Sequence, residues 1–418
     1  MHFWLINHYA VPPQYYPLAR QTNFAKNLME MGHKVTIIAA STVHNSDINL
    51  INDKQLWKRE TINNIDYVLI KCRKYGESNV KRIINMCEFA IKLPFVCRHL
   101  EKPDVIVSTS MPPMSCAMGI YLAKKYRCKG ISEIADLWPE SIIAYGIAGK
   151  HNPAVIWMRH LERWIYKKSD SIIFVDEGDY DYIIEQGWER IIPRSKVFCI
   201  SNGVELEDFN KNKERYIIHD IDLEDESIFK VVYTGSIRKV NGLGLLLDTA
   251  KRINDPRIKF LIWGKGDELP YLQSRIKEEG ITNVVFKGAV EKKYIPYITS
   301  KADLNIVHNT PMELFRFGIS FNKIFDYMAA GKPILCDFSC PYNPVIMTGC
   351  GIDVSDPTPE GIARQVEICS QMDSMEYSYY CDMAKKAAGI YDFKSLTCKL
   401  LDVVYGKALP IGSSEKVQ

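Results

Sequence analysis

The stretch FNKIFDYMAAGKPIL, residues 321–335, contains one helix-to-strand unit of an α/β fold. Ser320 is a favoured helix N-cap residue, and Gly331 followed by Pro333 is a stop signal, so the spacing predicts a helix of about ten residues between them. Apolar residues recur at i, i+3, i+4 and i+7, as in a half-buried helix, at Phe321, Ile324, Phe325 and Met328. The apolar run PILCD (333–337) follows at once and predicts a buried strand.

Similar units occur in two series along the chain. The first series of β-rich runs comprises HFWLIN (2–7), KVTIIAAS (34–41), YVLIKC (67–72), DVIVSTS (104–110), GISEIAD (130–136), SIIFVD (171–176) and KVFCIS (196–201). The second comprises KVVYTG (230–235), KFLIWG (259–264), NVVFKG (283–288), DLNIVHN (303–309) and PILCD (333–337). Because the runs are apolar on both faces and separated by helical periodicity, they predict an α/β fold with two doubly wound parallel sheets. The polar, acidic stretch 210–227 between the series is the best candidate for a linker.

The composition is that of a folded protein with two domains. The chain has 418 residues, of which 47% are hydrophobic and 25% charged, as in soluble globular proteins. Lys and Arg (53) nearly balance Asp and Glu (50), which argues against a nucleic-acid partner. The twelve cysteines form no C-x-x-C pair, the first residues become polar too soon for a signal peptide, and no apolar run reaches the ~18 residues of a membrane span. We therefore expect a cytoplasmic protein with reduced thiols and without a metal or cofactor.

Lys323 lies where a helix disfavours a cation. It would be the third residue of the predicted helix, where the backbone dipole costs a positive charge ~0.3–1 kcal/mol. Free N–H groups at a helix N-terminus bind anions, so a nucleotide diphosphate there would make Lys323 a counter-charge. Asn322 and Asp326 lie on the same polar side, next to Ser320. The alternative, a solvated Lys323–Asp326 pair, leaves the dipole penalty unexplained.

Several phrases resemble family 4 of the retaining glycosyltransferases, which have the GT-B fold. They are RQTNFAKNLMEMGHKVTII (20–38), SNGVELEDF (201–209), YTGSIRKVNGL (233–243), IWGKGDEL (262–269) and, most specifically, GISFNKIFDYMAAGKPIL (318–335). Within this family, STSMPPMS (108–115) followed by EIADLWPES (133–141) is similar to the bacterial branch that includes the N-acetyl-L-fucosamine transferases of surface-polysaccharide assembly. The resemblance covers nearly the whole chain.

The resemblance implies two Rossmann-like domains facing a cleft. Residues 1–205 would form the acceptor side, joined by the C-terminal helix 393–418, and residues 206–392 would bind a nucleotide sugar. The implied activity is a metal-independent, retaining transfer of an N-acetylated amino sugar from a UDP-sugar to a glycan on a polyprenyl diphosphate, in O-antigen or capsule biosynthesis. Such an acceptor would bring the protein to the cytoplasmic face of the inner membrane. A nucleotide-sugar 2-epimerase and a non-catalytic nucleotide-sugar-binding protein are the alternatives.

The resemblance also assigns roles in the second domain. The family's acidic residue at the place of Asp326 contacts the nucleotide ribose, and a second acid eight positions earlier is replaced here by Gly318, which leaves the donor sugar open. Gly235 would let the backbone approach a phosphate, and Arg238 and Lys239 would supply charge, because Ser236 and Asn241 stand where the family has its cations. Arg238 and Lys239 are explained equally well as ordinary exposed loop residues. Gly264 and Gly266 suit a turn under the nucleotide base, and an ordinary strand-to-helix turn explains them equally well.

Asp136, in the first domain, is the second candidate catalytic residue in addition to Lys323. It ends a predicted strand, where α/β proteins bind ligands, and the family places a His or Asp near the sugar there; a turn-capping role is the alternative. Arg20, where the long loop 8–21 leads into the next helix, is the cation we expect near the phosphates, unless it is a surface arginine. Glu133 is expected on the opposite side of the strand from Asp136.

Two further patterns concern metals and membranes. The D-x-D pairs Asp179/Asp181 and Asp220/Asp222 are read as charged surface rather than metal ligands. The basic, apolar segment 79–100 is either a core helix broken near Pro94, which we favour, or a helix in a membrane interface.

Overall fold

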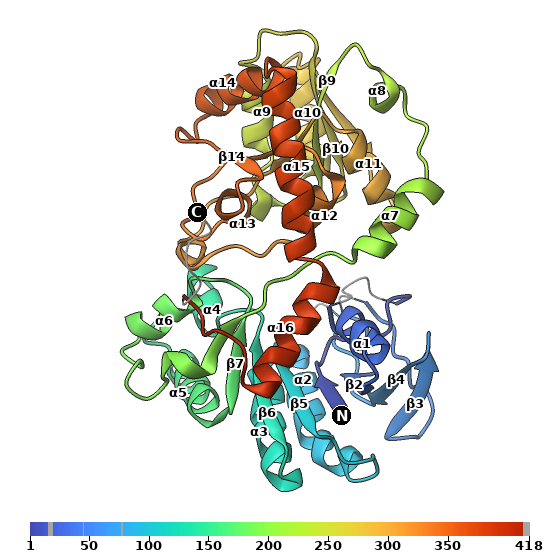
Figure 1. Ribbon diagram of the computed structural model, residues 1–418, viewed down its shortest axis with the longest axis vertical. Coiled ribbons are helices and arrows are strands. Elements are labelled where there is room, and N and C mark those ends of the chain that lie inside the picture. The colour runs from blue at the N-terminus through green and yellow to red at the C-terminus, as the bar shows by residue number, and fades with distance from the viewer. Residues whose placement is uncertain (16–19, 45, 77, 413–418) are drawn as a thin grey trace. The chain divides into compact units, whose positions relative to one another are not determined.

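The computed structural model describes residues 1–15, 20–44, 46–76 and 78–412, and the chain divides into two compact units. Unit 1 contains Met1–Ser201 together with the chain from Leu396 on, and unit 2 contains Asn202–Ser395. Residues 16–19, within the loop 8–21 noted above, lie outside the described residues. Each unit is an α/β fold with its own sheet (Figure 1).

Unit 1 is built on a sheet of order β3-β4-β2-β1-β5-β6-β7-β8. All neighbouring strands pair in parallel except β3 and β4, which form an antiparallel hairpin. The strands are β1 (His2–Ile6), β2 (Lys34–Ala40), β3 (Trp57–Ile62), β4 (Ile65–Ile70), β5 (Val105–Ser110), β6 (Lys129–Ile134), β7 (Ser171–Phe174) and β8 (Val197–Cys199).

The edge strand β3 was missed by the sequence analysis. It is largely polar and only partly buried, so it lacks the continuous apolar run of the other strands. The turn that joins it to β4 is formed by Asn63 and Asn64, which both have positive φ (51° and 66°). Asparagine tolerates this conformation in two-residue hairpin turns, so the Asn-Asn pair was the local signal for the hairpin.

Helices cover the sheet of unit 1. They are α1 (Arg20–Glu30), α2 (Asn79–Cys97), α3 (Pro113–Tyr126), α4 (Glu140–Ala144), α5 (Pro153–Lys168), α6 (Asp179–Glu185) and the 3-10 turn η1 (Arg194–Lys196). Helix α2 continues through Pro94, so the predicted break there was wrong. Its buried side chains Phe89, Leu93 and Val96 share a core with strands β1, β2 and β4. Its inner face therefore has the core role that the sequence analysis favoured.

Unit 2 has a fully parallel sheet of order β11-β10-β9-β12-β13-β14. The strands are β9 (Phe229–Thr234), β10 (Ile258–Trp263), β11 (Val284–Gly288), β12 (Leu304–Val307), β13 (Ile334–Cys336) and β14 (Gly351–Asp353). The helices and 3-10 turns are α7 (Leu206–Arg215), α8 (Ile221–Glu224), η2 (Lys239–Asn241), α9 (Gly244–Ala250), α10 (Leu269–Glu278), η3 (Lys292–Tyr294), α11 (Ile295–Lys301), η4 (Glu313–Phe317), α12 (Asn322–Ala330), α13 (Pro344–Met347), α14 (Pro359–Ser370) and α15 (Ser374–Ile390).

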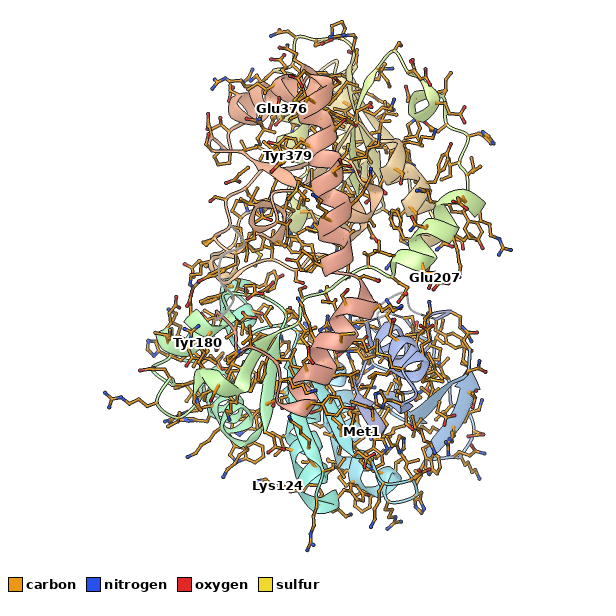
Figure 2. The ribbon with its side chains drawn as sticks, viewed as in Figure 1. Met1, Lys124, Tyr180, Glu207, Glu376 and Tyr379 are labelled. Carbon is orange, nitrogen blue, oxygen red and sulfur yellow. The ribbon has the colours of Figure 1, made fainter. Side chains whose placement is uncertain are left out.

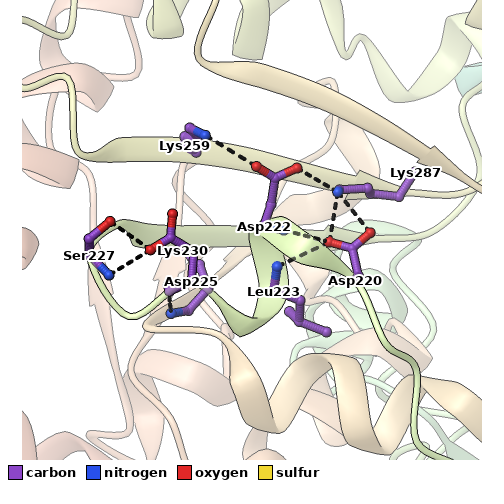
Figure 3. Close-up of polar contacts among 8 residues, drawn as sticks. All are labelled: Asp220, Asp222, Leu223, Asp225, Ser227, Lys230, Lys259 and Lys287. Atoms are coloured by element: carbon purple, nitrogen blue, oxygen red, sulfur yellow. Dashed lines mark hydrogen bonds and ion pairs between the residues drawn. The ribbon is translucent and has the colours of Figure 1, made fainter.

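The acidic stretch 210–227 belongs to unit 2, so its interpretation as a linker was wrong. It contains the end of α7 and all of α8, whose N-cap Asp220 accepts hydrogen bonds from two backbone N–H groups. Lys287 on β11 pairs with both Asp220 and Asp222 at 2.6–2.8 Å (Figure 3). Lys259 on β10 adds a second cation to Asp222. Both lysines lie on strands of the sheet. The acidic residues that suggested a solvated linker therefore hold the segment 210–227 to the sheet.

The last helix, α16 (Phe393–Tyr405), leads the chain from unit 2 back into unit 1. Lys129 Nζ at the start of β6 donates to the backbone carbonyls of Val403 (2.6 Å) and Val404 (2.9 Å). The backbone N–H of Ile411 donates to the Val197 carbonyl at 2.8 Å. The segment 403–411 is thus bonded to strands β6 and β8. No helix among the described residues is long and apolar enough to cross a membrane.

Candidate active site

Helix α12 begins without a side-chain cap. Its N-cap position is Phe321, not Ser320 as the sequence predicted. The Ser320 hydroxyl accepts a hydrogen bond from the Asn202 backbone N–H at 2.8 Å, and the Ser320 carbonyl accepts from Asn202 Nδ2 at 2.8 Å. Because these contacts engage Ser320, no described side chain caps the first N–H groups of α12. Lys323 becomes the second helical residue, one position nearer the uncapped end than expected.

The structure brings Lys323 to the loop that follows β9. Lys323 Nζ lies 4.1 Å from the centroid of the Tyr233 ring, and a Cβ built on Gly235 would lie 3.1 Å from the same nitrogen. The side chain is half-buried, and burial lowers the pKa of Lys323 to about 7, partly opposed by the negative charge of Asp337. Lys323 and Gly235 therefore meet at one point, as a shared phosphate site requires.

Gly235, Gly264 and Gly266 are needed for close backbone packing. The Gly235 N–H donates to the Trp263 carbonyl at 3.0 Å, and the Ile237 N–H to the Lys265 carbonyl at 2.9 Å. A Cβ on Gly264 would lie 1.9 Å from the Gly235 carbonyl oxygen, and one on Gly266 would lie 1.9 Å from that of Ile237. Only glycine avoids these overlaps, which gives Gly264 and Gly266 a structural reason that neither earlier interpretation contained.

The other predicted donor-binding residues of unit 2 lie on the loop after β9 and on the first turns of α12. Ser236 and Arg238 are solvent-exposed, and Ser236 Oγ donates to Asn241 Oδ1 at 2.9 Å. Asn322 is exposed at the helix start, and Asp326 is half-buried one turn further, where burial raises the pKa of its carboxyl group. The neighbouring Tyr327 hydroxyl accepts from the Thr234 N–H at 2.8 Å, which fixes α12 to the end of β9.

His308 and Asp337 form a buried pair that the sequence analysis missed. They follow Val307 and Cys336, which are paired in register on β12 and β13. His308 Nδ1 lies 2.5 Å from Asp337 Oδ2, and His308 Nε2 donates to the Gly242 carbonyl at 3.0 Å. The other Asp337 oxygen is buried without a hydrogen-bond partner among the described residues. The pair joins the loop after β9 to the carboxylate whose charge acts on Lys323.

In unit 1, Asp136 lies beside a second carboxylate. Ile134 on β6 pairs in register with Phe174 on β7, so Asp136 and Asp176 follow at the same level of neighbouring strands. Burial raises the pKa of Asp136 to about 6, and burial and the nearby Asp136 charge raise that of Asp176 to about 7. Because Asp136 itself is solvent-exposed, water offsets more of this effect there than at Asp176, whose Oδ1 is buried without a described partner. Carboxyl groups whose pKa values lie near neutral pH can bind sugar hydroxyls and accept a proton from one of them.

Arg20 has structural partners within unit 1. Its guanidinium group pairs with Glu133 at 2.9 Å and donates to the backbone carbonyls of Ser201 (2.5 Å) and Ile200 (2.7 Å). Glu133 is 4% exposed and also accepts hydrogen bonds from Gln21 and Thr109. A phosphate would have to compete with this buried carboxylate, so the contacts favour Arg20 as a support of the chain where unit 1 ends at Ser201.

The comparison with known proteins follows the same division of the chain. Residues 21–208 match the family model described as Glycosyltransferase Family 4, and residues 228–370 match the model described as Glycosyl transferases group 1. Both parts of the chain belong to glycosyltransferase families. Two curated relatives of this glycosyltransferase agree. It is 23% identical to the colanic acid biosynthesis glycosyl transferase WcaI of Escherichia coli, over 55% of this chain and 57% of that protein's length. It is 21% identical to the glycosyltransferase WbjE of Pseudomonas aeruginosa, over 76% of this chain and 83% of that protein's length.

Solved structures confirm the GT-B fold of this glycosyltransferase. Anabaena HepE in complex with UDP superposes with a TM-score of 0.66 and 12% identity, over 97% of this chain and 99% of that chain. An Escherichia coli protein described as trehalose-6-phosphate bound with UDP-2-fluoro glucose superposes with a TM-score of 0.70 and 12% identity, over 98% of this chain and 100% of that chain. At such identities the likeness establishes the fold, two Rossmann-like domains with parallel sheets, and leaves the substrates open.

Proposed function

We propose that the protein is a retaining glycosyltransferase that moves a sugar, an N-acetylated amino sugar by resemblance, from a UDP-linked donor to a glycan on a polyprenyl diphosphate. The observation that carries this proposal is the meeting of Lys323, Gly235 and the uncapped start of α12 at one point of unit 2. A cation, an open backbone and free N–H groups are the elements that recognise a diphosphate. HepE, a protein of the same fold, is described in complex with UDP, which supports this choice of nucleotide.

The chemistry assigned to unit 2 is stabilisation of the leaving diphosphate. As the bond to the sugar breaks through an oxocarbenium-like transition state, negative charge grows on the diphosphate. Lys323 and the first N–H groups of α12 would bind that charge more strongly in the transition state than in the ground state, which lowers the barrier. Asp326, one turn further along α12, would accept hydrogen bonds from the ribose.

The chemistry assigned to unit 1 concerns the acceptor. Asp136 would orient the sugar or the acceptor hydroxyl, beside the carboxyl group of Asp176. An acceptor that carries a lipid would require the protein to work at the cytoplasmic face of the inner membrane. WcaI is named for colanic acid biosynthesis, which supports a polysaccharide pathway such as O-antigen or capsule synthesis.

One set of reactions separates this function from its alternatives. The protein is incubated with a panel of UDP-sugars, with and without membrane extract, and products are identified by mass spectrometry. We expect sugar transfer only when membrane extract is present. NMR of the product should show the same anomeric configuration as in the donor. An epimerised nucleotide sugar in the absence of acceptor would identify a 2-epimerase. UDP-sugar binding without turnover under any condition would identify a non-catalytic binding protein.

A further inference from the structure

We propose that the outer faces of α2, α3 and α5 in unit 1 together form a docking surface for an anionic lipid bilayer. This basic apolar face is made of the exposed side chains of three helices that lie next to one another, with α3 packed between α2 and α5 (Figure 1). The proposal deepens the proposed function, because it identifies the surface through which a lipid-linked acceptor would be reached, but its physical basis is independent of any activity.

Large apolar side chains on this face are exposed to solvent over about 40% or more of their surface. On α5, Trp157 is 58% and Trp164 41% exposed, and the two lie seven residues apart on one side of the helix. On α2, an exposed stripe runs along the helix opposite its core residues. The other exposed apolar residues of the three helices are Val80, Ile83, Ile84, Ile91, Phe95, Tyr121 and Ile156.

The fold itself does not require these side chains. The inner faces of the helices already supply core residues, such as Phe89 and Leu93 of α2, Leu122 of α3 and Val155 and Ile165 of α5, each at most 2% exposed. An outer stripe of tryptophan and isoleucine costs solubility and contributes nothing to that core. A covering surface explains the stripe, and tryptophan is enriched where proteins meet the membrane interface.

The charge of the three helices selects an anionic surface. Within residues 79–97, 113–126 and 153–168 there are nine Lys and Arg, three on α2, two on α3 and four on α5, but only two acidic residues, Glu88 and Glu162. Both acids have partners: Glu88 pairs with Lys92, and the buried Glu162 pairs with Arg159 and accepts hydrogen bonds from two tyrosine hydroxyls. The whole chain has nearly equal numbers of both signs, so the excess is local.

Six of the nine cations are solvent-exposed and stand on the same three helices as the exposed apolar side chains. They are Lys81, Lys124, Lys125, Arg163, Lys167 and Lys168, and Lys124 lies near the end of α3 (Figure 2). Apolar and aromatic side chains among exposed Lys and Arg are the combination that binds lipid headgroups and inserts at the acyl boundary. A second copy of this face would bring like charges together, so the charge favours a bilayer over self-association.

Vesicle sedimentation tests the proposal on the full chain. The wild type should bind vesicles of phosphatidylcholine mixed with phosphatidylglycerol, and far more weakly phosphatidylcholine alone. The charge variant Arg163→Gln/Lys167→Gln/Lys168→Gln should lose about a hundredfold in affinity for the mixed vesicles, since each surface cation contributes about tenfold or less. The apolar variant Trp157→Ser/Trp164→Ser should also lose binding, and wild-type tryptophan fluorescence should shift to the blue with vesicles.

Matched controls come from unit 2. The variants Lys277→Gln/Lys301→Gln/Lys386→Gln and Tyr271→Ser/Ile221→Ser remove exposed cations and exposed apolar side chains from other helices and should bind vesicles as the wild type does. Equal binding by the face variants and the wild type, or no binding by the wild type, would overturn the proposal. A dimer that the Trp157→Ser/Trp164→Ser variant dissociates without any loss of vesicle binding would assign the face to a second copy instead. Calorimetric UDP affinity of the same variants tests the donor site separately, so failure of one proposal does not decide the other.

Discussion

Binding of UDP should add a proton to Lys323. In the free protein, burial beside the Tyr233 ring lowers the pKa of this lysine to about 7. A diphosphate at the start of α12 would supply the missing counter-charge and return the pKa towards its ordinary value of about 10.4. At pH 8 the free lysine is about one-tenth charged and the complex almost fully charged, so binding should take up about 0.9 proton. At pH 6 the lysine is already about nine-tenths charged, and the uptake from it should fall to about 0.1.

Isothermal titration calorimetry in buffers of different ionisation enthalpy measures this number directly. Compared with the wild type, Lys323→Met should take up about 0.9 proton fewer at pH 8 and about 0.1 fewer at pH 6. It should also bind UDP more than tenfold more weakly, because a charge-assisted hydrogen bond is worth ~1.5–3 kcal/mol. Lys323→Arg is the matched control, because arginine stays charged in the free protein. This variant should bind UDP without the proton uptake that Lys323 causes. Protons that UDP itself exchanges are the same in all variants, so they cancel when the variants are compared with the wild type at one pH.

Uridine provides the ligand control, because it has no phosphate. Its binding should take up no proton at Lys323 and should be nearly the same in the wild type and in Lys323→Met. The reasoning fails if the wild type and Lys323→Met take up the same number of protons with UDP at pH 8, or if the difference between them is as large at pH 6 as at pH 8. Either result would place the diphosphate away from the start of α12.

Three other perturbations test the remaining parts of the site. Asp136→Asn should lower turnover by ~10²-fold while UDP affinity by calorimetry stays nearly unchanged, and equal loss of UDP binding would contradict an acceptor-side role. Asp337→Asn removes the charge that raises the pKa of Lys323, so the pH above which UDP affinity declines should move lower; an unchanged profile would exclude this coupling. Gly264→Ala places a methyl group 1.9 Å from the Gly235 carbonyl oxygen and should lower the free energy of unfolding by ~1–3 kcal/mol in denaturant melts, whereas an unchanged midpoint would show that the two loops can separate.

The sequence by itself determined the fold class and the anomaly that leads to the donor site. Continuous apolar runs separated by helical periodicity are local features, and they predicted the parallel strands of both sheets except the short edge strand β14. The cap and stop signals located α12 within two residues, and the misplaced charge of Lys323 followed from position along that helix alone. The resemblance of residues 318–335 to glycosyltransferases needed no structure either, and the family comparison agrees with it.

Only the tertiary structure decided which side chains meet. The serine that should have capped α12 bonds instead to Asn202, and Arg20 pairs with Glu133, which had been expected outside the site. His308 with Asp337, and Asp136 with Asp176, are neighbours because parallel strands bring their carboxyl ends to one edge of a sheet in a fixed register. Strand order and register are set by how all the helices and strands of a unit bury their apolar faces together. Contacts between residues far apart in the chain therefore depend on that collective packing, and no local pattern contains them.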